Sequence, residues 1–238
     1  MLFSNISFIL NKPQLSENIG ACARAIKNFN FKKLILINPK PVFPNDKIIA
    51  TSVGAKDVIK NSKVFKNLES SINNFDYLIA TTSRFRNKNI KHIKLNELNK
   101  IDFRKKIAFL FGSEASGLSN NEISYANCVM QIPTNPNFKS LNLSHSVIII
   151  AQVVSSIIKS KNSKYSKSKK IKFASKNDIQ LMTNFCINML ENKNFFKPKE
   201  KKPIMLENLR NIFYKMELSE KEILILSSIF AQISKTRN

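Results

Sequence analysis

Short runs of β-branched and aromatic residues recur through the first two thirds of the chain, and polar turn residues bound each run. The runs are continuously apolar, which is typical of strands that a parallel sheet buries on both faces. On this pattern we predict strands at Ile6–Leu10, Lys33–Ile37, Tyr77–Thr81, Ile107–Phe111 and Val129–Ile132.

Stretches with helical spacing lie between these runs, at Asn18–Phe29, Asn67–Asn74 and Leu143–Ile158. Alternating strands and helices predict βαβ units around a parallel sheet, so we expect an α/β domain over residues 1–160. The most apolar run, Val147–Ile158, is interrupted by polar residues and is too short to cross a bilayer. We therefore expect a buried helix there and no membrane partner.

The composition changes after residue 160. Residues 161–176 are rich in Lys and Ser, which predicts a basic linker. In residues 177–238, Ser219 and Glu222 form a capping-box pattern, and Pro203 sits where a helix start tolerates it. We predict a small three-helix extension, whose apolar positions at helical spacing include Ile179, Met182, Phe185, Ile187, Leu190, Leu206, Leu209, Ile212 and Phe213.

The chain is strongly basic, with 39 Lys and Arg against 16 Asp and Glu, a net charge of +23 and a pI near 10.0. Such an excess favours a polyanionic partner such as a nucleic acid. Part of it can equally reflect compositional drift, because Lys, Asn and Ile are abundant throughout. No acidic residue occurs between Glu122 and Asp178, so the linker and the helix before it form one basic tract beside the candidate site.

Cysteine and histidine are scarce. The three cysteines, Cys22, Cys128 and Cys186, are far apart and show no CxxC spacing, which favours neither a disulfide framework nor a zinc site. With His92 and His145 as the only histidines, we expect no metal centre and no histidine-based triad. The amino terminus shows no signal peptide, and the expected location is the reducing cytoplasm.

Two glycine-containing motifs follow predicted strands. The first is Asn18-Ile19-Gly20-Ala21-Cys22-Ala23-Arg24, in which we expect Asn18 to cap a helix and Arg24 to project near the same end of the sheet. Alone, it equally fits an ordinary cap and a surface arginine. The second, Phe111-Gly112-Ser113-Glu114-Ala115-Ser116-Gly117-Leu118, lies where α/β sheets bind ligands, although a plain turn with Glu114 in solvent would look the same.

A third motif, Ile132-Pro133-Thr134-Asn135-Pro136-Asn137-Phe138-Lys139-Ser140-Leu141-Asn142-Leu143-Ser144, precedes an apolar helix. Two prolines stiffen the loop, and Ser140, Asn142 and Ser144 supply hydrogen-bonding groups at the head of the helix. Helix capping explains at least one of these groups. Three of them beyond a rigid loop indicate a binding surface.

Together the three motifs resemble the SpoU/TrmH branch of the SPOUT methyltransferases, whose pattern is NxGxxxR, then FGxExxGL, then IP followed by SLNLS. The resemblance implies an α/β SPOUT domain with a carboxyl-terminal trefoil knot, an exception to unknotted topology. It also implies S-adenosylmethionine bound in that knot as methyl donor to an RNA 2′-hydroxyl, with no metal.

The resemblance assigns roles residue by residue. Arg24 is similar to the catalytic arginine, and Asn18, Glu114, Ser140 and Asn142 to the groups around it. The cofactor wall corresponds to Thr81, Thr82, Ser83, Gly112, Ile132 and Leu141. Because a guanidinium is a poor base, Arg24 fits either a phosphate clamp or a desolvated base.

The tail resembles the carboxyl-terminal extension of TrmJ-type tRNA methyltransferases, through Phe195-Phe196 and Met205-Leu206-Glu207-Asn208-Leu209-Arg210. This implies a homodimer with a composite active site that methylates cytidine or uridine 32 in the tRNA anticodon loop. Two alternatives remain open: a ribosomal RNA ribose methyltransferase, and a non-catalytic RNA-binding protein on the same scaffold.

Overall fold

A computed structural model describes residues 2–83, 90–161 and 172–235. Within these ranges seven strands form one sheet in the order β3-β2-β1-β6-β4-β7-β5, and every neighbouring pair is parallel. The strands are β1 (Ile6–Asn11), β2 (Leu34–Ile37), β3 (Lys63–Phe65), β4 (Tyr77–Thr81), β5 (His92–Lys94), β6 (Ile107–Phe111) and β7 (Cys128–Gln131).

Successive side chains on the central strands enter two separate apolar cores. On β1, Phe8 and Leu10 join one core whereas Ile9 joins the other, as the two-residue period of a strand requires. All six residues of β1 are buried, which explains why its sequence is continuously apolar apart from two small polar residues. The sheet is therefore covered on both faces, as the sequence predicted.

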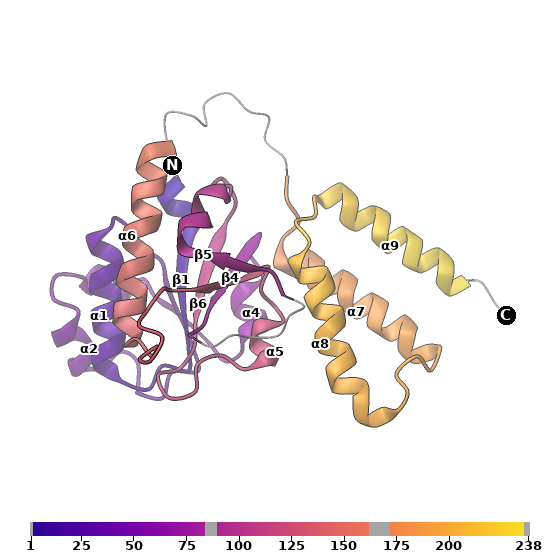
Figure 1. Cartoon of the computed structure of the whole chain (residues 1–238), viewed down its shortest axis with the longest axis horizontal. Coiled ribbons are helices and arrows are strands. Elements are labelled where there is room, and N and C mark those ends of the chain that lie inside the picture. The colour runs from indigo at the N-terminus through magenta and orange to yellow at the C-terminus, as the bar shows by residue number, and fades with distance from the viewer. Residues whose placement is uncertain (1, 84–89, 162–171, 236–238) are drawn as a thin grey trace.

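Helices cover the two faces in layers (Figure 1). The first core receives α1 and α6, and α2 and α3 pack against α1, whereas the second core receives α4, α5 and the helices of the tail. The helices are α1 (Ser16–Asn28), α2 (Asp46–Thr51), α3 (Lys56–Lys60), α4 (Leu68–Ile72), α5 (Asn120–Ile123), α6 (Leu143–Lys161), α7 (Lys176–Asn192), α8 (Lys202–Lys215) and α9 (Glu220–Lys235). Short 3₁₀ helices occur at η1 (Leu2–Asn5), η2 (Leu95–Lys100) and η4 (Lys199–Lys201).

The five predicted strands are all present: β4 and β6 have the predicted bounds, β1 and β2 differ by one residue at one end, and β7 is shifted by one residue at both ends. The prediction missed β3 and β5, which form the two edges of the sheet. On each of these three-residue strands only the middle or last residue is even partly buried, so no apolar run marks them.

Among the described residues, α6 is the one helix long and apolar enough to cross a membrane on length and composition alone. Its Val147, Ile150, Val154 and Ile158 are fully buried in the first core, beside α1. This packing gives the helix the buried position that its sequence predicts.

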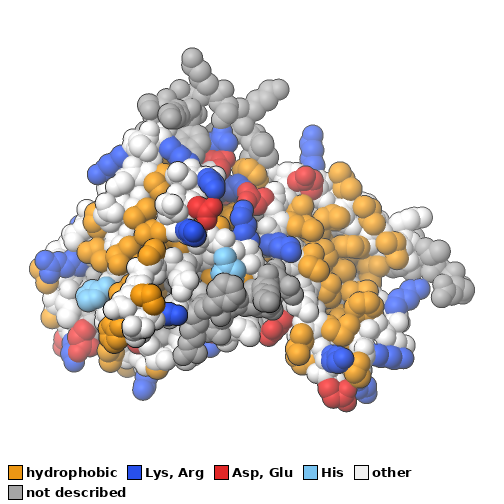
Figure 2. All heavy atoms as spheres, in the orientation of Figure 1, with side chains coloured by type: hydrophobic (Ala, Val, Ile, Leu, Met, Phe, Trp, Pro, Cys, Tyr) orange, Lys and Arg blue, Asp and Glu red, His pale blue; other side chains and the backbone are white. Residues whose placement is uncertain are grey.

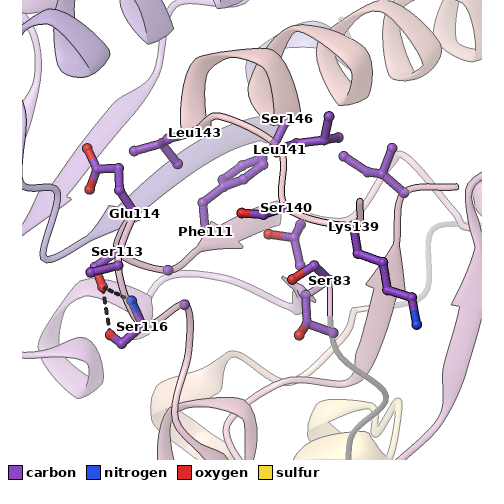
Figure 3. A pocket seen from close by; sticks show the side chains of 16 residues that line it. Ser83, Phe111, Ser113, Glu114, Ser116, Lys139, Ser140, Leu141, Leu143 and Ser146 are labelled. Carbon is purple, nitrogen blue, oxygen red and sulfur yellow. Dashed lines mark hydrogen bonds between the residues drawn. The ribbon is translucent and has the colours of Figure 1, made fainter. Parts of the chain in front are cut away.

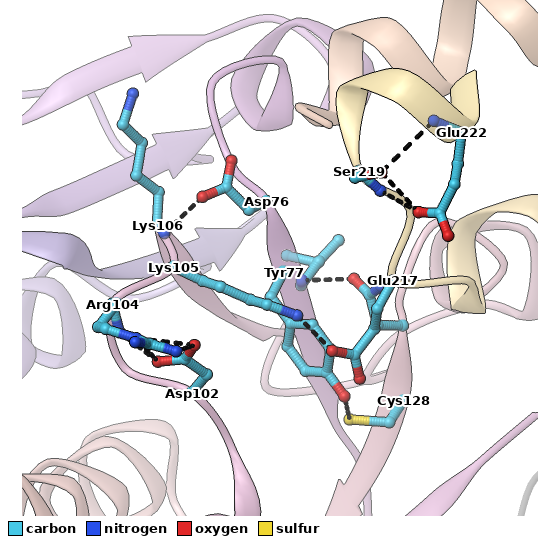
Figure 4. Close-up of polar contacts among 12 residues, drawn as sticks. Asp76, Tyr77, Asp102, Arg104, Lys105, Lys106, Cys128, Glu217, Ser219 and Glu222 are labelled. Atoms are coloured by element: carbon cyan, nitrogen blue, oxygen red, sulfur yellow. Dashed lines mark hydrogen bonds and ion pairs between the residues drawn. The ribbon is translucent and has the colours of Figure 1, made fainter. Parts of the chain in front are cut away.

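The tail is fastened to the α/β unit by polar and apolar contacts. The Lys105 ammonium, almost fully buried, pairs with Glu217 and lies 3.9 Å from the centroid of the Phe173 ring (Figure 4). The Arg210 guanidinium donates to the Tyr125 hydroxyl at 2.7 Å, and that hydroxyl donates to Glu69 at 2.6 Å. The predicted capping box is confirmed, because the Ser219 backbone N–H donates to the Glu222 carboxylate at 2.6 Å.

The helices α8 and α9 lie within the predicted extension, and α7 begins one residue before it, at Lys176. Pro203 lies in the first turn of α8 as expected. Most of the predicted linker, residues 162–171, lies outside the described residues. The outer face of α9 is apolar, with Leu224, Ile225 and Ile229 exposed, and Figure 2 shows apolar side chains gathered over the tail. In the single chain this face is open to solvent.

Candidate active site

Three loops at the carboxyl edge of the sheet enclose a cavity of about 500 Å³ (Figure 3). They follow β4, β6 and β7, which are adjacent in the sheet, so segments far apart in the chain meet here. The lining residues are Thr81, Thr82, Ser83, Phe111, Gly112, Ser113, Glu114, Ala115, Ser116, Gly117, Ile132, Lys139, Ser140, Leu141, Leu143 and Ser146. All six positions predicted for the cofactor wall are among them, together with Glu114 and Ser140.

The loop after β6 folds back on itself to form one wall. A Cβ on Gly112 would lie 2.2 Å from the Gly117 carbonyl carbon and 2.5 Å from the Leu118 nitrogen, both backbone atoms. Gly117 has a φ of +66°, a conformation that glycine adopts without strain. Its N–H donates to the Ser113 carbonyl at 2.9 Å, which closes the loop. The backbone of this loop therefore explains why glycine occurs at both positions.

The loop after β4 is tied to both neighbouring strands. The Thr81 hydroxyl donates to the Leu110 carbonyl at 3.0 Å, and the Thr82 N–H donates to the Met130 carbonyl at 3.1 Å. The Gln131 amide donates to the Ser83 carbonyl at 3.0 Å. These bonds fix the backbone on this side of the cavity relative to β6 and β7.

The Glu114 carboxylate is the capping group of α1. It accepts the Gln14 N–H at 2.8 Å, the Leu15 N–H at 3.3 Å and the Asn18 side-chain amide at 2.8 Å. A negative charge at a helix N-terminus is favourable, and Leu15, the N-cap residue, has no capping side chain of its own. The expectation that Asn18 caps the helix is wrong, because the helix begins two residues earlier and Glu114 supplies the acceptor.

Asn18 links the first motif to the third. It is 6% exposed, and its side-chain oxygen accepts the Asn142 amide N–H at 3.0 Å. The Asn142 oxygen in turn accepts the Ser144 N–H at 2.8 Å and the Ser144 hydroxyl at 2.7 Å, which caps α6. One hydrogen-bonded chain therefore joins Glu114, Asn18, Asn142 and Ser144.

Arg24 lies outside this arrangement. It sits on α1, six residues beyond Asn18 and so about 9 Å further along the helix axis, and it is exposed. It does not line the cavity of its own chain. Gly20 serves packing, because a Cβ there would lie 2.0 Å from the Thr51 hydroxyl and 2.5 Å from the Ile48 carbonyl of α2.

Several lining residues were not predicted to be part of the site. Lys139 and Leu143 belong to the third motif and border predicted positions, so adjacency alone could have indicated them. Ser146 carries a weaker signal: it lies one turn after Asn142, and its hydroxyl donates to the Asn142 carbonyl at 3.2 Å. No group of three or more His, Cys, Asp or Glu is placed to hold a metal ion within the described ranges.

The lining residues fit S-adenosylmethionine. A volume of about 500 Å³ suits a nucleoside-sized ligand. Phe111, Ile132 and Leu141 offer apolar surface for a base, and the serine and threonine hydroxyls offer partners for polar groups. Ser83 and Ser140 lie near the centre of the view in Figure 3, whereas the Glu114 carboxylate points outward, in keeping with its bonds to the start of α1. The cavity therefore suits an amphipathic cofactor.

This fold and cavity define the class: an α/β protein that holds a small ligand at the carboxyl edge of a parallel sheet. A family model, the SpoU rRNA Methylase family, matches residues 5–152. The chain therefore belongs to the SpoU rRNA methylase family, whose members use S-adenosylmethionine as methyl donor.

Among its relatives is the tRNA (cytidine-2′-O-)-methyltransferase TrmJ of Methanocaldococcus jannaschii, 29% identical over 94% of this chain and 98% of that protein. The crystal structure of TrmJ from Z. mobilis ZM4 matches with a TM-score of 0.85 and 27% identity, over 96% of this chain and 99% of the other. The SpoU methyltransferase AviRb from Streptomyces viridochromogenes, solved with AdoMet, shares the fold at 19% identity and a TM-score of 0.52, over 65% of this chain and 60% of that one.

Proposed function

We propose that this chain is a tRNA 2′-O-ribose methyltransferase that uses S-adenosylmethionine. The observation that carries the proposal is the convergence of all six predicted cofactor positions on one cavity, beside the network of Glu114, Asn18 and Asn142. Several relatives that match nearly the whole chain, tail included, are named as tRNA 2′-O-methyltransferases, and another is named as a tRNA/rRNA methyltransferase. We further propose a pyrimidine at position 32 of the anticodon loop as the target.

S-adenosylmethionine supplies a methyl group already activated on a sulfonium, so the chain itself has to align the ribose 2′-hydroxyl and assist the loss of its proton. The Ser140 side chain faces the cavity and is placed to orient a hydroxyl there. Glu114 and Asn18 act as positioning residues, because they fix the start of α1 against Asn142 and the head of α6.

We propose that Arg24 acts in the cavity of a second copy, in a homodimer with a composite site. Arg24 is exposed and outside the cavity of its own chain, so a catalytic Arg24 requires a partner. Its exposure supports the phosphate-clamp role over the base role, because a guanidinium loses its proton only when strongly desolvated. The trefoil knot of the family is a further part of this proposal.

We also propose that the tail, residues 177–238, contributes to tRNA binding and that the enzyme works in the cytoplasm.

Cys22, Cys128 and Cys186 are free and buried. Burial raises the pKa of the Cys22 thiol well above its usual range and that of Cys128 to about 11, so both are poor nucleophiles.

Methyl transfer to defined RNAs tests the proposal. The purified chain is incubated with labelled S-adenosylmethionine and either an unmodified tRNA transcript or a ribosomal RNA transcript, and 2′-O-methyl sites are mapped. We expect a single ribose methylation in the tRNA, at position 32. Methylation of the ribosomal RNA alone would establish the first alternative, and failure to bind S-adenosylmethionine in calorimetry would establish the non-catalytic one.

A further inference from the structure

The Phe138 side chain stands in solvent beside the cavity. It is 75% exposed, and among the exposed large hydrophobic side chains of the described residues only Val42 is more exposed. A single exposed apolar residue needs no explanation by itself. Phe138, however, lies on an ordered turn next to the cavity wall, and this position suggests a role for its ring.

A tight turn holds Phe138 in place independently of any packing of its ring. The Phe138 N–H donates to the Asn135 carbonyl at 2.9 Å, and the Asn137 N–H donates to the Asn135 side-chain oxygen at 2.9 Å. Pro136, within the turn, has a fixed φ. The aromatic side chain is therefore presented on a backbone that is ordered before any ligand arrives, which lowers the entropy cost of binding.

The turn leads directly into the cavity wall. Lys139 and Ser140 follow Phe138 and line the cavity, so Phe138 lies within about 7 Å along the chain of the Ser140 backbone. Lys139 is exposed and positively charged. An aromatic face next to a cation at the mouth of an active site suits a nucleotide, whose base stacks while its phosphate pairs.

We propose that Phe138 is the stacking platform for the base of the nucleotide whose ribose is methylated, with Lys139 pairing with an adjacent phosphate. The inference rests on the proposed function, and it assigns Phe138 as a residue that positions the substrate nucleotide in the same site. When the ribose of a nucleotide enters the cavity, its base lies at the rim. There an unstacked base from an RNA loop can stack on the Phe138 ring. Stacking reads the π-face that every base has, so it positions the nucleotide and does not select its identity.

Two substitutions separate stacking from simple packing. Phe138→Leu keeps apolar volume and removes the π-face, whereas Phe138→Tyr keeps the ring. Val64→Ala is the control, because Val64 is 51% exposed on the edge strand β3, away from the cavity strands. The readouts are the tRNA dissociation constant by anisotropy, KM and kcat for the transcript, the S-adenosylmethionine dissociation constant, and the mass in solution.

We expect Phe138→Leu to raise the dissociation constant and KM for tRNA about tenfold or more, with S-adenosylmethionine binding and mass unchanged. Phe138→Tyr and Val64→Ala stay near wild type. The inference is overturned if Phe138→Leu binds RNA with wild-type affinity, or if Phe138→Tyr loses as much RNA affinity as Phe138→Leu. It is also overturned if Phe138→Leu loses the mass of a dimer, because Phe138 would then be an interface contact.

An abasic transcript identifies which base stacks. The base is removed from the proposed target nucleotide, at position 32. The wild-type protein should then lose the same RNA affinity that Phe138→Leu loses with the intact transcript, and the variant should lose no further affinity. If the variant loses as much again, Phe138 contacts something else. RNA binding decides this even if the wild-type chain transfers no methyl group, which would refute the proposed function alone.

Discussion

The Asn18 side-chain oxygen accepts the Asn142 amide N–H at 3.0 Å, across 124 residues of sequence. The Asn18 amide N–H donates to Glu114, and the Asn142 side-chain oxygen accepts the Ser144 N–H at the start of α6. Each amide is therefore oriented by a different partner, and neither can flip without breaking at least two hydrogen bonds. The first and third motifs are held in one fixed relation by this pair.

Replacement of Asn142 by aspartate should break that relation. The ionised carboxylate that Asn142→Asp introduces has no donor for the Asn18 oxygen and repels it, while the cap on Ser144 survives. We expect at least about a tenfold loss of kcat, corresponding to about 1.4 kcal/mol of transition-state stabilisation, with a near-normal melting temperature. Asn120→Asp, at an exposed position in the first turn of α5, is the control. Wild-type kcat in Asn142→Asp would show that the pair does not position reacting groups.

The two loop glycines should differ sharply when replaced by alanine. A Cβ at Gly112 collides with backbone atoms of Gly117 and Leu118, which have no room to move without opening the loop. A Cβ at Gly117 meets nothing within 4 Å and costs only the strain of its positive φ, about 1–2 kcal/mol.

We therefore expect Gly112→Ala to abolish S-adenosylmethionine binding in calorimetry, and Gly117→Ala to retain it with a lower melting temperature. Comparable affinity in the two variants would mean that closure of this loop does not shape the cavity.

The buried Lys176 makes stability depend on pH. Its ammonium donates to the Tyr214 carbonyl at 3.1 Å and lies 5.0 Å from the Tyr214 ring centroid, where α7 meets the sheet. Burial, together with the neighbouring charge of Lys105, lowers its pKa to about 7, while Cys128, Asp76 and Glu217 oppose the shift. In the unfolded chain the pKa of a lysine is about 10.4.

Between about pH 7 and pH 10 the unfolded chain therefore binds more protons at Lys176 than the folded chain does. The contribution of this residue to stability rises with pH across that window and is lost as pH falls toward 7. Urea unfolding from pH 7 to 10 should show a flatter pH dependence for Lys176→Met than for wild type. Lys172→Met, at an exposed ion pair with Glu220, should follow wild type. Parallel curves for wild type and Lys176→Met would rule out this titration.

The sequence predicted what depends on burial and local pattern. The central strands and α6 were predictable because each buries a continuous apolar run, and the capping box of α9 because Ser219 and Glu222 are local. The edge strands β3 and β5 were not, because partly exposed residues form them only once neighbouring strands exist.

The site was predictable as a set of residues but not as a geometry. The family resemblance named the residues of the cavity wall, and they meet because the carboxyl ends of neighbouring parallel strands lie at one edge of the sheet. It could not show that Glu114 accepts the backbone N–H groups of Gln14 and Leu15 at the start of α1, because these bonds join segments about 100 residues apart. Nor could it show that Arg24 faces solvent two turns away.

Mixed dimers test whether Arg24 serves the partner's cavity. Arg24→Ala and Asn142→Asp chains, each impaired in methyl transfer alone, are coexpressed with different tags and the mixed species is purified. If Arg24 acts across the interface, one of the two sites keeps both an intact cavity and an intact arginine, and activity rises above that of either variant alone. If Arg24 acts within its own chain, every site in the mixed dimer carries one defect and the mixed dimer is no more active than the two variants alone.

The acceptor atom can be tested with two tRNA transcripts that differ at one position, a 2′-hydroxyl or a 2′-deoxy ribose at the mapped nucleotide. The purified chain is given labelled S-adenosylmethionine and each transcript in turn, and label in RNA is counted. We predict stoichiometric transfer to the ribose transcript and none to the deoxy transcript. Equal labelling of both would contradict ribose methylation and place the methyl group on a base.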